Sequence, residues 1–474
     1  MRLKPAILIT VLLLLTCYGA AQTQYLLTTS PSSVQDVCNR HGLGPVAPLW
    51  SSNNTAIYLV TPPAGFVPAS LETEVEDDTA VVGFERNQTV GLPELSAASA
   101  NVAQSTGVIL DGLTNRTVVS FFGNNVASYY VQQPALSILR IADGRAATGL
   151  TGVGTVAVID TGVDPNHPAL ASVLAPGYDF TRNLAGIPNE FNDLDPAIAA
   201  ILAQSTGVIL DSTTLVHASG GVLPVLEQST VVNLTQSTGV ILDQSTGVIL
   251  DQSTGVILDQ STGVILDSSL PHAFGHGTMT AGLVHLIAPT ARIMPLKAFS
   301  ADGSSDVASI LRAIYYAVDH GANVINMSFE MPAPSPGVRA AVNYAQNHNV
   351  ILVAAAGNDA STTAVWPAAL SNVLGIGSTS NTDVRSSFSN YGSTDVTFAA
   401  PGEGVITTYP GNHYAAVWGT SFSSPLVAGG AVLLQQKSPQ GGFSYIMNAL
   451  NKSAVSVTYM NRGRIDLYKA LLYQ

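Results

Sequence analysis

Two continuous apolar runs constrain the fold of this chain more than any other feature of its sequence. Residues 155–159 (TVAVI) lead into Asp160, and residues 350–356 (VILVAAA) lead into Gly357-Asn358. Runs of this kind, without polar alternation, are typical of strands buried on both faces of a parallel sheet. Helix and strand signals alternate from about residue 130 to the end, as a parallel sheet with connecting helices requires. The sequence therefore predicts an α/β fold with a mostly parallel sheet.

Composition narrows the classes of function. The chain has 474 residues, with 18 Lys or Arg and 31 Asp or Glu, and a formal net charge of −13. This acidic balance argues against a nucleic-acid-binding protein, which needs a basic surface. Hydrophobic residues make up 46% and charged residues 10% of the chain, the opposite of a disordered composition. Two cysteines are too few for a disulfide scaffold or a cysteine-based zinc site.

The start of the chain has the order of an export signal. Two basic residues precede an apolar run at 6–16, and small residues follow at 19–21. This pattern predicts a signal peptide over residues 1–21 and a secreted protein, extracellular or periplasmic. The run is too short for a stable membrane span, and no longer apolar stretch follows. Lipid anchoring at Cys17 is the disfavoured alternative, because Thr16 stands where a small residue is usual.

The region after the signal divides into a small folded unit and a polar stretch. Residues 24–86 have a mixed α/β pattern, with strand candidates at 25–28, 56–61 and 80–84 and helix candidates at 33–41 and 71–77. From about residue 92 to 127 the chain is rich in Ser, Ala, Asn and Thr. That composition predicts a linker or processing region.

An octapeptide, Gln-Ser-Thr-Gly-Val-Ile-Leu-Asp, is repeated along the chain. It occurs at 104–111 and 204–211, and then four times in tandem over 236–267. Gly and β-branched residues disfavour a helix, and an even period keeps equivalent side chains on one face of a strand. Stacked strands and a disordered loop therefore remain as alternatives. A binding role is disfavoured, because the repeats lack aromatic residues and clusters of metal ligands.

Three segments carry candidate catalytic side chains, each with a structural alternative. Asp160 ends a buried strand, where open α/β sheets place their sites, but it could be a turn carboxylate. His276 lies among small residues just before a predicted helix at 278–286, but it could be a core histidine. Ser421 precedes the small-residue helix 426–431, but it could be an N-cap.

Together the three segments resemble the subtilisin-like serine proteases, in the order Asp, His, Ser. The resemblance covers about residues 130–474, interrupted by a repeat-containing insert near 190–270. It implies a doubly wound sheet and the roles of a catalytic triad. Ser421 would be the nucleophile, His276 the general base, and Asp160 the carboxylate that orients the imidazole. Asn358 would be the oxyanion-hole donor, with the Ser421 backbone N–H beside it.

The same resemblance implies a substrate-binding strand end at Ser328, Phe329 and Glu330. In the family this segment pairs with substrate backbone and walls the primary specificity pocket, and glycine usually stands where Glu330 does. With Asp359 nearby, the departure would allow a preference for basic or polar side chains, although this is not the favoured interpretation.

No metal ligand or cofactor is predicted. Relatives often bind calcium through a carboxylate nine residues after the catalytic aspartate, and here that position is Ala169. The usual strong calcium site of the family is therefore expected to be absent. Asp193 and Asp195 could bind a cation, but solvated charge is the favoured interpretation.

The resemblance also gives the N-terminal unit a meaning. Residues 22–93 are expected to be a prosegment that assists folding and inhibits the protease, followed by a processing region at 94–129 and the catalytic domain at 130–474. Cleavage is expected between residues 87 and 135. The predicted function is a secreted serine endopeptidase acting on proteins or peptides. The alternative is a catalytically silent cell-surface or binding protein on the same scaffold.

Overall fold

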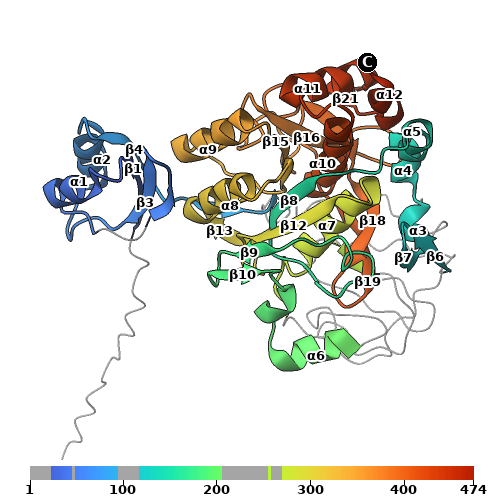
Figure 1. The fold of residues 1–474 in the computed structure, drawn as a ribbon, viewed down its shortest axis with the longest axis horizontal. Coiled ribbons are helices and arrows are strands. Elements are labelled where there is room, and N and C mark those ends of the chain that lie inside the picture. The colour runs from blue at the N-terminus through green and yellow to red at the C-terminus, as the bar shows by residue number, and fades with distance from the viewer. Residues whose placement is uncertain (1–22, 45–47, 94–116, 205–254, 258–269) are drawn as a thin grey trace, which may run out of the picture. The chain divides into compact units, whose positions relative to one another are not determined.

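The chain forms two compact units in the computed structural model. Residues 23–44, 48–93, 117–204, 255–257 and 270–474 are described (Figure 1). Unit 1 ends at Asn87 and unit 2 begins at Gln88. The expected signal peptide at 1–21 lies outside the described residues.

Unit 1 is a four-stranded antiparallel sheet with two helices, as the mixed pattern predicted. Its elements are β1 (Tyr25–Thr29), α1 (Val34–His41), β2 (Pro48–Ser51), β3 (Ala56–Val60), α2 (Pro68–Glu76) and β4 (Val81–Arg86). The strand order is β2-β3-β1-β4. Helix α1 is capped at its C-terminus by Gly42, whose φ of 64° is left-handed, a conformation that glycine adopts without strain. The sequence missed β2, because this edge strand is largely exposed and has no buried face to reveal it.

Unit 2 is built on a ten-stranded sheet in the order β10-β9-β12-β8-β14-β15-β16-β17-β21-β20. Its strands are β8 (Thr155–Asp160), β9 (Gly177–Asp179), β10 (Leu184–Gly186), β12 (Arg292–Lys297), β14 (Val324–Met327), β15 (Ile351–Ala355), β16 (Val373–Thr379), β17 (Phe398–Pro401), β20 (Val455–Val457) and β21 (Met460–Arg464). Only the two edge pairings, β10 with β9 and β20 with β21, are antiparallel. The predicted α/β class with a mostly parallel sheet is confirmed.

Helices cover both faces of this sheet (Figure 1). The helices of unit 2 are α3 (Ser128–Val131), α4 (Pro134–Leu139), α5 (Ile141–Thr148), α6 (Pro196–Gln204), α7 (His276–Ile287), α8 (Val307–Asp319), α9 (Pro336–Asn347), α10 (Thr420–Lys437), α11 (Gly442–Ser453) and α12 (Leu467–Leu472). Helices α7 and α10 pack on each other, and α8 packs on α9. The strands between them are almost completely buried, which explains why the sequence runs are apolar without alternation.

Short strand pairs complete unit 2. They are β5 (Thr89–Gly91) with β13 (Ser304–Asp306), β6 (Val118–Phe121) with β7 (Asn124–Ala127), and β18 (Glu403–Tyr409) with β19 (His413–Trp418). The β6–β7 hairpin differs from the expected linker at 94–129, because Phe121 and Val126 are buried in the core of unit 2. The polar composition of that stretch concealed the few apolar positions that anchor it. Residues 94–116 lie outside the described residues.

One copy of the octapeptide contributes a short strand. Within the copy at 252–259, β11 (Gly255–Ile257) pairs antiparallel with β19. These three residues are therefore a strand, but their partner is β19 and not another copy of the repeat, so the stacking of repeats stays a prediction. The other copies lie outside the described residues.

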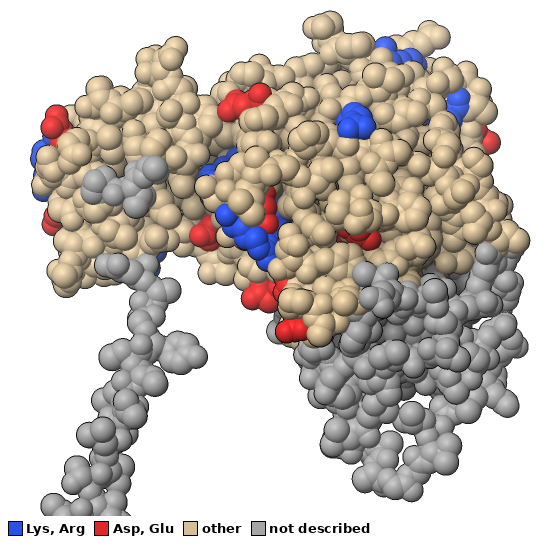
Figure 2. Space-filling model, turned by 60° about the horizontal axis from the view of Figure 1, so that its bottom comes forward, with Lys and Arg blue, Asp and Glu red and all other residues tan. Residues whose placement is uncertain are grey.

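Charge is sparse on the molecular surface. In the view of Figure 2, Lys and Arg side chains form small separate groups rather than a continuous basic stripe. The absence of a nucleic-acid partner stays a prediction. Among the described residues, no helix has both the length and the apolar character needed to cross a bilayer.

Candidate active site

Asp160 and His276 form a buried hydrogen-bonded pair. Asp160 is the last residue of β8 and His276 the first of α7, and neither residue has solvent-accessible surface. The His276 Nδ1–H donates to Asp160 Oδ1 over 2.7 Å. Asp160 also accepts the Thr161 N–H at 2.8 Å and the Thr280 hydroxyl at 3.1 Å. These bonds fix the carboxylate and hold the imidazole in one tautomer.

Two glycines let the strand and the helix approach so closely. A Cβ atom on Gly277 would lie 2.1 Å from the carbonyl oxygen of Gly162, so no other residue fits. Gly162 itself has a left-handed φ of 115°. The residues that follow Asp160 and His276 are therefore in backbone contact, which explains why small residues surround both in the sequence.

Ser421 lies in the first turn of α10 and is fully buried. Its hydroxyl donates to the carbonyl oxygen of Ser328 at 3.3 Å. The ring of Phe422, the next residue, lies 5.3 Å from the His276 ring, centre to centre. The structure thus brings the three predicted triad residues to one edge of the sheet. The N-terminal end of a helix there favours developing negative charge.

Asn358 follows β15 and faces the start of α10. Its Oδ1 accepts the Thr420 N–H and the Thr420 hydroxyl, both at 2.9 Å. These bonds determine which end of the amide is oxygen, and so direct the amide NH2 group away from Thr420. A donor is thereby oriented beside the turn that carries Ser421.

The predicted substrate-binding segment, Ser328 to Glu330, follows β14 at the same edge. Residues 89–91 (β5) run beside this segment. On one side they pair antiparallel with β13. On the other side Gly91 exchanges two backbone hydrogen bonds with Glu330, of 3.3 and 3.0 Å. The side chain of Phe329 is fully buried and packs on Phe299 at 5.3 Å between ring centres. Only the backbone of Phe329 is therefore available for pairing.

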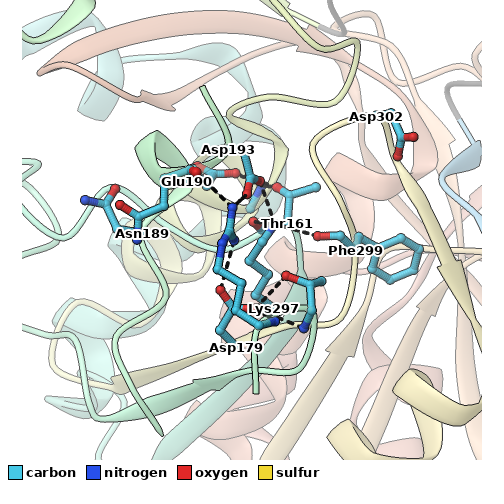
Figure 3. A network of polar contacts seen from close by, with 12 residues as sticks. Thr161, Asp179, Asn189, Glu190, Asp193, Lys297, Phe299 and Asp302 are labelled. Atoms are coloured by element: carbon cyan, nitrogen blue, oxygen red, sulfur yellow. Dashed lines mark hydrogen bonds and ion pairs between the residues drawn. The ribbon is translucent and has the colours of Figure 1, made fainter. Parts of the chain in front are cut away.

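A buried cation lies beneath the turn that follows Asp160 (Figure 3). The Lys297 ammonium group, fully buried at the end of β12, donates to the carbonyl oxygens of Thr161 and Phe299 at 2.7 and 2.6 Å. It also pairs with Asp193 at 2.7 Å. The side chain of Asp193 is only 9% exposed and also pairs with Arg182. The expectation that Asp193 is solvated is therefore wrong, whereas Asp195 is exposed as expected.

Sequence reasoning missed a second buried acid, Glu190. It begins the short 3-10 helix η4 (Glu190–Asp193) and is 1% exposed. It accepts hydrogen bonds from the hydroxyls of Thr161 and Thr278 and from the backbone N–H groups of Gly277 and Thr278, the latter two at 3.2 and 3.3 Å. The signal in the sequence was an acidic residue at the start of the insert, shortly before the octapeptide copy at 204–211.

Burial shifts the pKa of this carboxyl group into the neutral range. Burial, helped by the negative charge of Asp160, raises the pKa of Glu190 to about 7 against the opposing effects of the two threonine hydroxyls and Lys297. The pKa of the nearby Tyr409 phenol is also raised, by burial and by the charge of Glu190. Glu190 therefore changes charge near neutral pH.

The described residues offer no cluster of three or more His, Cys, Asp or Glu that could hold a metal ion. Ala169, at the position of the family's calcium carboxylate, is fully buried. The absence of a cofactor stays a prediction.

A doubly wound sheet with an acid, an imidazole and a hydroxyl gathered at one edge defines the class of α/β serine hydrolases. A model of the subtilase family matches residues 153–465. Thermitase of Thermoactinomyces vulgaris is 39% identical over 211 residues, which cover 42% of this chain and 75% of thermitase. Subtilisin BL of Lederbergia lenta is 37% identical over 203 residues, which cover 41% and 73%. A thermophilic serine proteinase of Bacillus sp. (strain AK1) is 32% identical over 322 residues, covering 67% and 61%.

The chain belongs to the subtilase family and is a serine endopeptidase. This confirms the predicted family, the doubly wound fold and the enzyme class.

Proposed function

We propose that this endopeptidase acts through an acyl-enzyme on Ser421. The hydroxyl of Ser421 attacks the scissile carbonyl while His276 Nε2 takes its proton and later returns it to the leaving amine. Asp160, held by hydrogen bonds from His276, Thr161 and Thr280, orients the imidazole and stabilises its charged form. The buried 2.7 Å contact between His276 and Asp160 is the observation that carries the proposal.

The developing oxyanion would bind the amide of Asn358 and the backbone N–H of Ser421. The contacts of Asn358 Oδ1 with Thr420 support this role, because they leave the NH2 end directed elsewhere. Loss of the corresponding asparagine in a subtilisin lowers kcat by roughly 100- to 1000-fold. Asn358→Ala is expected to behave in the same way, with little change in KM.

The substrate would lie as an extended strand between Ser304–Asp306 and Ser328–Glu330. The backbone pairing of residues 89–91 with both segments supports this site, because it uses no side-chain recognition. The carboxylate of Glu330 lies against Gly357, where a Cβ would be 2.8 Å from Glu330 Oε2. This negative charge supports a preference for basic or polar side chains, which digestion of a peptide library with the wild type and Glu330→Gln tests.

Residues 22–93 would be a prosegment that inhibits the enzyme. Unit 1 supports this role because it is a separate compact unit, and the residues directly after it fill the proposed substrate strand. The pairing of Gly91 with Glu330 supports a processing point shortly after Gly91, because the chain there runs along the segment that contains Ser328. The Ser328 carbonyl accepts the hydroxyl of Ser421, so a bond at or close to Pro93–Glu94 is the expected processing point.

Amino-terminal sequencing of the active protein tests this assignment. Active protein should begin at or close to Glu94, whereas a start near residue 22 would refute the prosegment. Pro93 is not basic, but an intramolecular substrate has a high effective concentration and need not match the preference for external substrates. Release of the active form into the medium would support the predicted secretion.

An activity-based fluorophosphonate probe tests the catalytic proposal. The processed wild type should be labelled and should hydrolyse peptides, and Ser421→Ala should lose both properties. A correctly processed wild type that is not labelled would instead favour the silent scaffold.

A further inference from the structure

A single buried carboxylate links the two segments that carry the acid and the base of the triad. One oxygen of Glu190 accepts the hydroxyl of Thr161, the residue after Asp160, and the N–H of Gly277, the residue after His276. The other oxygen accepts the hydroxyl and the N–H of Thr278. Every one of these contacts is a donor to the carboxylate.

The surroundings of Glu190 match its ionised form. The Thr161 hydroxyl accepts the Gly277 N–H at 2.9 Å, and the Thr278 hydroxyl accepts the Asp164 N–H at 2.8 Å. Each hydroxyl therefore accepts one backbone N–H and donates to Glu190, while the Thr161 hydroxyl also lies 3.3 Å from Asp160 Oδ1. Protonation of the carboxylate would weaken these contacts, because the donors would then meet a neutral carboxyl group and one hydroxyl would have to turn to accept the added proton.

We propose that Glu190 is a positioning residue of the endopeptidase, whose ionised carboxylate holds the first turn of α7 against the end of β8 and thereby keeps His276 aligned with Asp160. The inference rests on the proposed function of the triad. Glu190 reaches the triad only through Thr161, Gly277 and Thr278, so it is not itself a catalytic residue.

The charged and titratable neighbours of Glu190 determine the pH at which its carboxyl group ionises. Asp160 from β8 opposes ionisation of Glu190, and Lys297 from β12 favours it. Tyr409 from β18 faces the same carboxylate, and His276 from α7 lies one residue from two of its donors. Because burial raises the pKa of Glu190 to about 7, the carboxylate becomes ionised within the range in which a histidine base also loses its proton.

Asp193, at the other end of η4, has a separate set of partners. It bonds to Lys297 and Arg182 rather than to the residues after His276. The four residues of η4 therefore present two acids to different parts of the site. Of these two acids, Glu190 is the one that contacts the residues next to both Asp160 and His276.

The dependence of kcat/KM on pH tests the proposal. In the processed wild type, both His276 and Glu190 must lose a proton, so the acid limb of log kcat/KM should fall more steeply than one unit per pH unit. Glu190→Gln should reduce the slope to one, because a single ionisation remains. Its kcat at alkaline pH should drop by about tenfold, as expected for one lost charge-assisted hydrogen bond, with KM nearly unchanged.

A second variant covers the case in which Glu190→Gln does not fold. Thr278→Val removes one hydroxyl donor to the charged form, which should move the acid limb to higher pH by about one unit. The matched control is Asp466→Asn, which alters a buried carboxylate that caps α12 through the Lys469 N–H. This control should keep the wild-type profile even if its stability falls.

The outcomes separate this inference from the proposed function. A wild type that neither hydrolyses peptides nor takes up a fluorophosphonate would overturn the proposed function. An active wild type whose acid limb has the same slope and midpoint in Glu190→Gln and Thr278→Val would overturn only the role of Glu190.

Discussion

The two halves of the active site rest on different kinds of buried polar group. The half that holds Asp160 and His276 lies on ionisable side chains, Glu190, Lys297 and Asp193. The half that holds Ser421 lies on neutral ones. The Ser328 hydroxyl donates to the Ser421 carbonyl at 2.7 Å and accepts from Asn326 at 2.9 Å, and Asn326 accepts from Ser424.

This difference predicts how each half responds to pH and to substitution. A buried ion is stable only with its partner, so removal of one member leaves an uncompensated charge. A neutral network loses only the hydrogen bonds that are removed. The half with the base should therefore be the more fragile, and the network around Ser328 should contribute the same stability at every pH. The following substitutions, made in a Ser421→Ala background to prevent self-digestion, test that contrast.

The largest effect is expected for Asp193→Asn. This change leaves the fully buried Lys297 ammonium with two carbonyl acceptors and without its ion-pair partner. The free energy of unfolding should fall by about 3–5 kcal/mol, measured by denaturant unfolding near neutral pH. Arg182→Gln is the control, because its side chain is 32% exposed and the loss should stay within about 1 kcal/mol. Equal losses in the two variants would contradict the special role of the Lys297 pair.

The second effect is a change in the pH dependence of stability. The pKa of Glu190 is raised from 4.5 to about 7 in the folded protein, so the unfolded chain releases this proton first. Stability therefore falls as pH rises from the unfolded to the folded pKa, and the full cost remains above about pH 7. Between about pH 5 and pH 8, the free energy of unfolding should fall by roughly 2–3 kcal/mol less in Glu190→Gln than in its parent.

The comparison with the parent isolates Glu190 from other shifted groups. Burial lowers the pKa of His167 and of His285 to about 4, and both histidines are present in the parent and in the variant. Their contributions cancel in the difference. Parallel curves of stability against pH would show that Glu190 does not titrate in this range.

The third effect concerns the neutral half. Ser328→Ala removes the donor to the Ser421 carbonyl and the acceptor of the Asn326 amide. The expected loss is about 1–3 kcal/mol, smaller than for Asp193→Asn. Because no ionisable group takes part, the loss should be equal at about pH 5 and about pH 8. If the loss of unfolding free energy in Ser328→Ala changed with pH, the two halves of the site would not differ in their response to pH.

The sequence predicted those site residues that lie within a recognisable local motif. Asp160, His276 and Ser421 each stand at the junction of a buried element and a glycine-containing turn, and the sheet brings such junctions to one edge. Asn358 follows the same rule. The strand pattern predicted the sheet because burial on both faces leaves long apolar runs.

The sequence did not reveal the supports of those residues. The donors to Glu190 come from two segments that lie 29 and 87 to 88 residues away, and Asp193 meets Lys297 across 104 residues. No local pattern reports such pairs, and an acid before a repeat array resembles a solvated loop. The hairpin formed by β6 and β7 was missed for a similar reason, since only a few of its residues reach the core.

The smallest effect is expected for Asp195→Asn, two residues beyond the buried acid. Asp195 is exposed, and its carboxylate accepts the Ala197 N–H at 2.8 Å at the start of α6. Asparagine can accept the same bond, so the change in the free energy of unfolding should stay within about 0.5 kcal/mol. The same denaturant titration used for Asp193→Asn measures it. A loss of stability close to that of Asp193→Asn would contradict this expectation. It would mean that Asp195, at the start of α6, also stabilises the half of the site that holds His276.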